Sequence, residues 1–204
     1  MTHTALLIVD TQPTFCEGGG LPVEGGNAVA ARIGDHLAAH RDDYDLVVAS
    51  QDWHLDPGDH WAPEGTAPDF VTTWPRHGEA GSDEAALHPA LVERAGGLID
   101  DVVRKGMDRA AYSAFEGVVV DDDGGASLVP SGPPLAEHLR AKGIERLDVV
   151  GIATDHCVRM SALDAAAAGF ETRVLLDLTA GVAPETTAAA IEELRAAGVE
   201  VTTS

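Results

Sequence analysis

Residues 147–163 read LDVVGIATDHCVRMSAL, an apolar run that leads through a short polar break into an alanine-rich segment. The β-branched apolar residues predict a strand that is buried on both faces, and Val158, Ala162 and Ala166 recur at helical spacing. A buried strand that leads into a helix is the repeating unit of folds with a parallel sheet. This stretch therefore predicts an α/β fold.

The same alternation recurs along the whole chain. Short runs rich in Val, Ile and Leu occupy residues 4–10, 45–50, 98–105, 146–152, 172–177 and 198–203. Apolar residues at helical spacing lie between them, at Val29, Ile33 and Leu37, at Leu135 and Leu139, and at Ile191 and Leu194. Because such crossovers are right-handed and cover both faces of the sheet, we predict a three-layer α/β/α fold with a mostly parallel, doubly wound sheet of six strands.

Composition restricts the class of protein and its partners. The 204 residues, 45% of them hydrophobic, are enough for one core, so we expect a single domain over residues 1–204. The net charge of −21 repels nucleic acid and anionic membranes, which we exclude as partners. The sequence shows neither a signal peptide nor a long apolar span, so we expect a soluble, cytoplasmic protein. Two cysteines far apart in the chain predict no disulfide framework.

Two segments interrupt the alternation of strands and helices. Residues 51–90 are rich in Pro, Gly, His and Trp, and a loop of that length is typically functional or disordered. Its three tryptophans favour an ordered, packed loop. Residues 116–134 predict instead a small hairpin or exposed excursion with an acidic tip.

Reactive side chains stand where the predicted strands end. Asp10, Asp52 and Lys105 end or follow the first three strands, and Cys157 follows the fourth. Ligands of open parallel sheets bind beyond the carboxyl ends of the strands, so these side chains are candidates for a common site. Each aspartate could instead be a helix cap or turn residue. The convergence of all four side chains favours a reactive site over separate caps and turns.

Cys157 lies at the predicted junction of strand and helix. Unpaired N–H groups and the helix dipole would favour a thiolate there and bind a developing oxyanion. We expect Asp10 to exchange protons with the thiol and the leaving amine, and Lys105 to hold the two charges. The alternative is a small buried hydrophobe, which we assign to Cys16, and we expect the ring of His156 to point away from the site.

The histidine-rich loop predicts a metal site formed by Asp52, His54, His60 and His77. Asp-x-His on an extended segment places both side chains on one side. Three imidazoles and one carboxylate suit one divalent transition metal ion, Fe, Mn, Zn or Co, rather than Mg or Ca. A scatter of surface histidines is the alternative.

Four segments together resemble the nicotinamidases and pyrazinamidases of the isochorismatase-like, or cysteine hydrolase, superfamily. They read LLIVDTQPTFCEGGGLPV, SQDWHLDPGDHW with WPRHG, KGMDRAAYSAFEG and VVGIATDHCVRMSALDA, and the resemblance spans essentially the whole chain. It implies a catalytic triad of Asp10, Lys105 and Cys157. It also implies that the predicted metal is held by Asp52, His54, His60 and His77.

The resemblance implies further parts of the site. The backbone N–H groups of Ala153 and Cys157 would form an oxyanion hole, with a cis peptide bond before Ala153. Phe15, Trp74 and Tyr112 match the family's pocket aromatics, against which a flat pyridine ring stacks. The sequence departs from the family at QPTF, where members commonly carry Asp and this chain has Thr14.

The activity implied by the resemblance is hydrolysis of nicotinamide to nicotinate and ammonia through a thioester on Cys157. The metal would orient the ring, pyrazinamide would be a second substrate, and the reaction would serve pyridine-nucleotide salvage. The alternatives are another hydrolase of the superfamily, which generally lacks the histidine-rich loop, a metallohydrolase that activates water, and a non-catalytic binding protein. The last two predict that Cys157→Ala leaves function intact.

Overall fold

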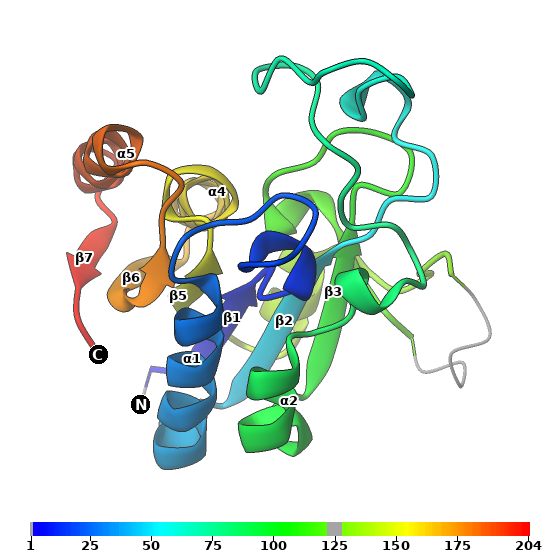
Figure 1. Ribbon diagram of the computed structural model, residues 1–204. Helices are drawn as coiled ribbons and strands as arrows, with labels where there is room; N and C mark the ends of the chain where they lie inside the picture. The colour runs from blue at the N-terminus through cyan, green and yellow to red at the C-terminus, as the bar shows by residue number, and fades with distance from the viewer. Residues whose placement is uncertain (1, 122–127) are drawn as a thin grey trace.

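A seven-stranded sheet forms the middle layer of the computed structural model, which describes residues 2–121 and 128–204 (Figure 1). Its strands are β1 (Thr4–Val9), β2 (Leu46–Asp52), β3 (Asp101–Lys105), β4 (Val118–Val119), β5 (Arg146–Ile152), β6 (Glu171–Ala180) and β7 (Glu200–Thr202). They lie in the order β4-β3-β2-β1-β5-β6-β7, and all neighbours are parallel except β3 and β4. The order runs outward from β1 in both directions, which confirms a doubly wound sheet.

Helices cover both faces of this sheet, which confirms the three-layer α/β/α class. α1 (Gly26–His40) and α2 (Pro89–Ala95) contribute buried residues to the apolar cluster on one face. The cluster on the other face receives residues of α3 (Leu135–Ala141), α4 (Arg159–Ala167) and α5 (Pro184–Ala196). No helix in the described part of the chain is long and apolar enough to cross a bilayer.

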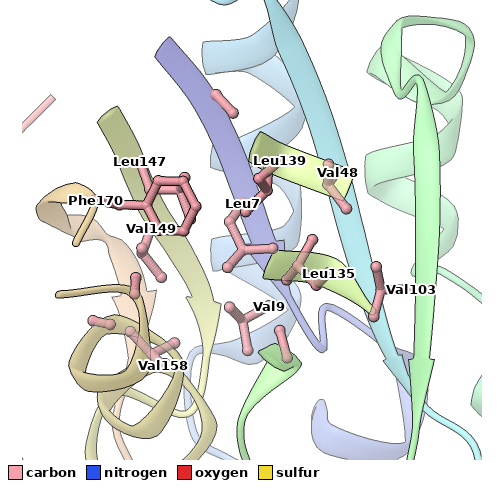
Figure 2. Packing of buried hydrophobic residues seen from close by; sticks show 14 of the residues in the cluster. Leu7, Val9, Val48, Val103, Leu135, Leu139, Leu147, Val149, Val158 and Phe170 are labelled. Carbon is pink, nitrogen blue, oxygen red and sulfur yellow. The ribbon is translucent and has the colours of Figure 1, made fainter. Parts of the chain in front are cut away.

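The apolar runs are continuous because both faces of each central strand are buried. In β1, Leu7 and Val9 belong to the cluster with α3 and α4, whereas Leu6 and Ile8 belong to the cluster with α1 and α2. Successive side chains of a strand point to opposite faces, so one uninterrupted run fills two cores. Figure 2 shows the first cluster, where Leu7 and Val9 lie among side chains from β2, β5 and the covering helices.

The structure corrects the predicted number of strands from six to seven. The additional strand, β4, has only two residues and pairs antiparallel with β3. It lies within residues 116–134, where we predicted a hairpin or excursion, and the tip at residues 122–127 lies outside the described residues. The short helix α2 was also not predicted, although Pro89 at its first turn is a usual helix start.

β1 and β5 approach each other very closely at the edge where the predicted site lies. Gly151 pairs with Val9 and has a φ of +121°, a conformation that residues with a side chain rarely adopt. A Cβ atom at residue 151 would lie 2.0 Å from the carbonyl oxygen of Val9. Glycine at this position therefore lets the strands that carry Asp10 and Cys157 lie side by side.

We expect Gly151→Ala to lower the free energy of unfolding by about 3 kcal/mol or more, because it adds a steric clash to an unfavourable φ. Gly169→Ala is the matched control, since Gly169 also has a positive φ but no atom within 4 Å of the added Cβ. It should cost only about 1–2 kcal/mol. Urea denaturation measures both values, and equal losses would show that close packing at Gly151 is unimportant.

Candidate active site

Four side chains predicted from strand ends meet at the carboxyl edge of the sheet. Asp10 directly follows β1, Asp52 ends β2, Lys105 ends β3, and Cys157 follows β5. Asp52 and Lys105 are register partners in neighbouring strands. The topology therefore brings together residues that are separated by up to 147 positions in the sequence (10 to 157).

The ammonium group of Lys105 connects these side chains. Its Nζ lies 3.0 Å from Oδ2 of Asp10 and 3.1 Å from Oδ1 of Asp52. It also donates to the carbonyl of Ala111 at 3.1 Å and lies 3.9 Å from Sγ of Cys157. The side chain is fully buried, and the two carboxylates balance its charge.

Burial and charge oppose each other at every member of this cluster. Burial alone would lower the pKa of Lys105, but the charges of Asp10, Asp52 and Cys157 raise it well above its usual value. Burial likewise favours the neutral form of Asp52, but Lys105, His54 and His77 hold the pKa of that carboxyl well below its usual range. Lys105 is therefore an ammonium ion and Asp52 a carboxylate at neutral pH.

Asp10 and Cys157 differ from Asp52 because the effect of burial on their pKa is larger than the opposing effect of the Lys105 charge. Burial raises the pKa of Asp10 above its usual value, although Lys105 opposes the shift. Burial also raises the pKa of Cys157 well above its usual value, and the charges of Asp10 and Asp52 add to the effect. The pair thus consists of a thiol and a carboxyl with raised proton affinity, which suits exchange of a proton between them.

The local structure around Cys157 corrects the expectation of a thiolate at a helix start. The residue lies within a single π-helical turn, Thr154–Val158, which precedes α4. Its side chain is almost completely buried, and desolvation keeps the proton on sulfur. The free protein therefore holds a thiol that needs a base. Asp155 of the same turn accepts backbone N–H bonds from Val182 and Ala183, which anchors the turn to the start of α5.

The histidines of the long loop form a buried cluster beside Asp52. One ring nitrogen from each of His54, His60 and His77 lies within 4.8 Å of the others. Oδ2 of Asp52 lies 3.1 Å from Nε2 of His54 and 3.4 Å from Nε2 of His77. Three imidazoles thus converge inside the protein and Asp52 contacts two of them, which a scatter of surface histidines would not do.

Backbone carbonyls orient two of these rings. Nδ1 of His54 is hydrogen-bonded to the carbonyl of Gly106, and Nδ1 of His77 donates to the carbonyl of Pro75 at 2.7 Å. With the Nδ1 protons held this way, the Nε2 lone pairs face the centre of the cluster, as in protein metal sites. Burial, followed by the neighbouring imidazoles, lowers the pKa of His60 to about 4, so that ring is neutral at pH 7.

These residues fit a divalent transition metal ion. Neutral imidazole and carboxylate are the ligands that Fe, Mn, Zn and Co accept, and a set of four leaves coordination positions open on a six-coordinate ion. The ionised Asp52 also supplies the negative charge that favours a cation in a buried site. The donor set does not determine which of these metals binds.

Aromatic rings contact this cluster. The ring of Phe15 lies 5.7 Å from that of His77, and the ring of Tyr112 lies 6.1 Å from that of His60. Nε1 of Trp74 donates to the Tyr112 hydroxyl at 3.2 Å, which joins the long loop to the segment after β3. The three predicted aromatics therefore lie near the histidine cluster, two of them in direct contact with its rings.

His156 belongs to the same aromatic group, contrary to our expectation that it points away. Its ring stacks on Tyr112 with centroids 6.4 Å apart and meets the edge of Trp74 at 5.8 Å. The expectation assumed an ordinary α-helical phase after the strand, whereas the π-helical turn adds a residue to that turn. Ala153, the predicted oxyanion residue, immediately precedes this turn, and its peptide bond with Ile152 is cis as expected.

The sequence matches the Isochorismatase domain family over residues 4–204. The chain belongs to this family. It is 50% identical to the nicotinamidase/pyrazinamidase of Mycobacterium tuberculosis, over 98% of each chain. It is 36% identical to the nicotinamidase of Escherichia coli, over 100% of this chain and 96% of the relative.

Solved structures with the same fold include proteins with bound ligands. The pyrazinamidase of Pyrococcus horikoshii, in complex with zinc, has a TM-score of 0.77 and 31% identity, and the match covers 99% of both chains. PnC1 from L. infantum, in complex with nicotinate, has a TM-score of 0.77 and 35% identity over 99% of this chain and 93% of that one. The isochorismatase fold of this chain is therefore shown by both sequence and structure.

The sequence patterns did not predict the polar side chains that support the site. In this isochorismatase-family chain, the amide of Gln12 accepts from the N–H of Asp52 at 2.9 Å and donates to its carbonyl at 3.0 Å, which fixes a metal-ligand candidate. Thr14, which stands where family members commonly carry Asp, accepts from the N–H of Gly78 at 3.2 Å, directly after His77. Only the position of Gln12, two residues after a strand-end Asp, could have signalled its role.

We expect Gly106→Ala to weaken metal binding by about 10–100-fold, the usual loss when groups behind the ligands are disturbed. A Cβ at this residue would lie 2.6 Å from Cε1 of His54 and 2.9 Å from Oδ1 of Asp52. Gly143→Ala is the matched control, because Gly143 has a similar positive φ but no atom near the added Cβ. Competition with a chelating dye measures both affinities, and unchanged affinity in Gly106→Ala would argue against this metal site.

Proposed function

We propose that this chain, as one hydrolase domain over residues 1–204, is a nicotinamide amidohydrolase that also accepts pyrazinamide. The observation that carries the proposal is the buried Lys105 ammonium, which contacts Asp10, Asp52 and Cys157 beside the histidine cluster. That arrangement supplies a nucleophile, a proton carrier and a ring-binding site in one place. Full-length relatives named nicotinamidase support the same substrate.

The histidine cluster favours this reaction over those of the other superfamily hydrolases considered above. Asp52, His54, His60 and His77 would hold the metal, and the aromatic rings beside them would enclose a flat heterocycle. An ion held by these residues would leave a position for a pyridine or pyrazine nitrogen, and that contact would orient the carboxamide. The substrate is therefore a small, uncharged heteroaromatic amide, and the reaction belongs to pyridine-nucleotide salvage in the cytoplasm.

In the first half of the reaction, Cys157 forms the new bond. Its thiol proton passes to Asp10 as the sulfur attacks the carboxamide carbon, and the N–H groups of Ala153 and Cys157 receive the oxyanion. Asp10 then returns that proton to the amide nitrogen, the C–N bond breaks, and ammonia leaves. A thioester between the nicotinoyl group and Cys157 remains.

In the second half, water replaces the nitrogen. Asp10 takes a proton from the water molecule, whose oxygen attacks the thioester carbon. The C–S bond then breaks, and Asp10 returns the proton to the sulfur, while the product acid ionises to nicotinate. Lys105 stays an ammonium ion throughout and stabilises whichever of Asp10 and Cys157 is negatively charged.

We expect Cys157→Ala to lower kcat for nicotinamide by about 1,000-fold or more, because the nucleophile is lost. Cys16→Ala is the control: burial raises the pKa of Cys16 to about 12, and the residue packs in the apolar cluster with α1. Ammonia release by both variants, with metal content measured on the same samples, tests the proposal. Substantial turnover by metal-loaded Cys157→Ala would favour attack by activated water instead.

We expect benzamide to be a far poorer substrate than nicotinamide, with kcat/KM lower by about 100-fold or more, because it lacks the ring nitrogen and its carboxamide is not oriented. Pyrazinamide carries a nitrogen in the same relation to the carboxamide and should be hydrolysed. His54→Ala should weaken nicotinamide binding as well as turnover. Equal hydrolysis of benzamide and nicotinamide by the metal-loaded enzyme would show that the ring nitrogen is not a point of recognition.

A further inference from the structure

Ser50 makes two hydrogen bonds to a single residue, Asp10. The Ser50 hydroxyl donates to Oδ1 of the Asp10 carboxylate at 2.7 Å and accepts from the Asp10 backbone N–H at 3.1 Å. Both side chains are completely buried. Ser50 lies in β2, the strand that pairs with β1, two residues before Asp52. The hydroxyl thus bonds the backbone and the side chain of the proposed proton carrier at once.

Asp10 needs such support because its backbone is strained. Its φ is +43°, a positive value that only a few per cent of non-glycine residues adopt, although Asn and Asp do so more often than most. The conformation lets Asp10 leave the end of β1 and turn toward Lys105. The backbone N–H of Asp10 is a buried donor, and the Ser50 hydroxyl satisfies it.

The two carboxylate oxygens of Asp10 have different surroundings. Oδ1 accepts from Ser50, whereas Oδ2 forms an ion pair with Lys105 at 3.0 Å. Ser50 thus occupies Oδ1, and Oδ2 lies on the side where Asp10 meets the Lys105 ammonium.

We propose that Ser50 is a positioning residue for hydrolysis, which holds Asp10 in its strained conformation and leaves Oδ2 to exchange the proton with Cys157. The inference rests on the proposed function for its kinetic consequence. It names a role for a side chain that contacts neither the aromatic rings nor the histidine nitrogens in any interaction described above. Loss of the hydroxyl should therefore reduce the chemical step and spare substrate binding.

The kinetic test compares three variants with the wild type. Ser50→Ala should lower kcat for nicotinamide about 10-fold or more with KM within about 3-fold, since proton transfer by a positioned group contributes at least that much. Ser50→Thr retains the hydroxyl and should recover most of the rate. Thr172→Val is the control, because it removes another buried hydroxyl, which donates to the Phe170 carbonyl at the opposite end of the sheet. It should leave both constants unchanged.

A crystal structure of Ser50→Ala tests the same inference without substrate. We expect the Asp10 carboxylate to rotate or the residue to leave its positive φ. An unchanged Asp10 in that structure, or a kcat within twofold of the wild type, would overturn the inference. A fall in kcat together with an equally large rise in KM and loss of metal would also overturn the inference, because these changes indicate general damage to the site. Failure of the wild type itself to hydrolyse nicotinamide would refute the proposed function, and the crystal structure would still decide the role of Ser50.

Discussion

The buried ammonium of Lys105 is the interaction on which the rest of the site depends. Two buried carboxylates and a buried thiol lie together, an arrangement that would be strongly unfavourable without a positive charge among them. Removing one partner from a buried ion pair typically costs about 3–5 kcal/mol, because the remaining charge is left uncompensated. The ends of β1, β2 and β3 and the turn that carries Cys157 are therefore held together by one side chain.

Asp52 joins the reaction centre to the metal cluster. One of its oxygens pairs with Lys105 and the other faces the rings of His54 and His77. A change of charge at Lys105 or at the histidines therefore alters the electrostatic environment of the other through a single carboxylate. In the proposed mechanism this geometry couples ring recognition to thiol chemistry. Hydrogen bonds from Gln12 to the Asp52 backbone and from His54 to the Gly106 carbonyl hold the backbone and the ring around it.

The strand ends carried most of the predictable information. Apolar runs located six of the seven strands, and the doubly wound order then placed Asp10, Asp52, Lys105 and Cys157 at one edge. β4 was not predicted because a strand of two residues shows no periodicity in the sequence. The direction of His156 was mispredicted because a π-helical turn changes the helical phase, and no local pattern marks such a turn.

The charge states of the site and the contacts that support it could not be predicted from the sequence and became visible only in the structure. The position of Cys157 beside a helix suggested a thiolate, but burial depends on tertiary packing and reverses that expectation. The double role of Asp52 could not be predicted, since spacing does not show which oxygen faces which partner. Ser50 is a neutral residue within an apolar strand, and its two bonds to Asp10 follow only from the pairing of β1 with β2.

The central claim is that Cys157 carries the substrate as a thioester. Mass spectrometry of the protein quenched within its first turnovers of nicotinamide tests it most directly. The account predicts a nicotinoyl adduct on the peptide that contains Cys157, which appears before free nicotinate reaches its steady rate and is absent from the Cys16 peptide. Rapid release of nicotinate with no adduct on Cys157 at any time would contradict it.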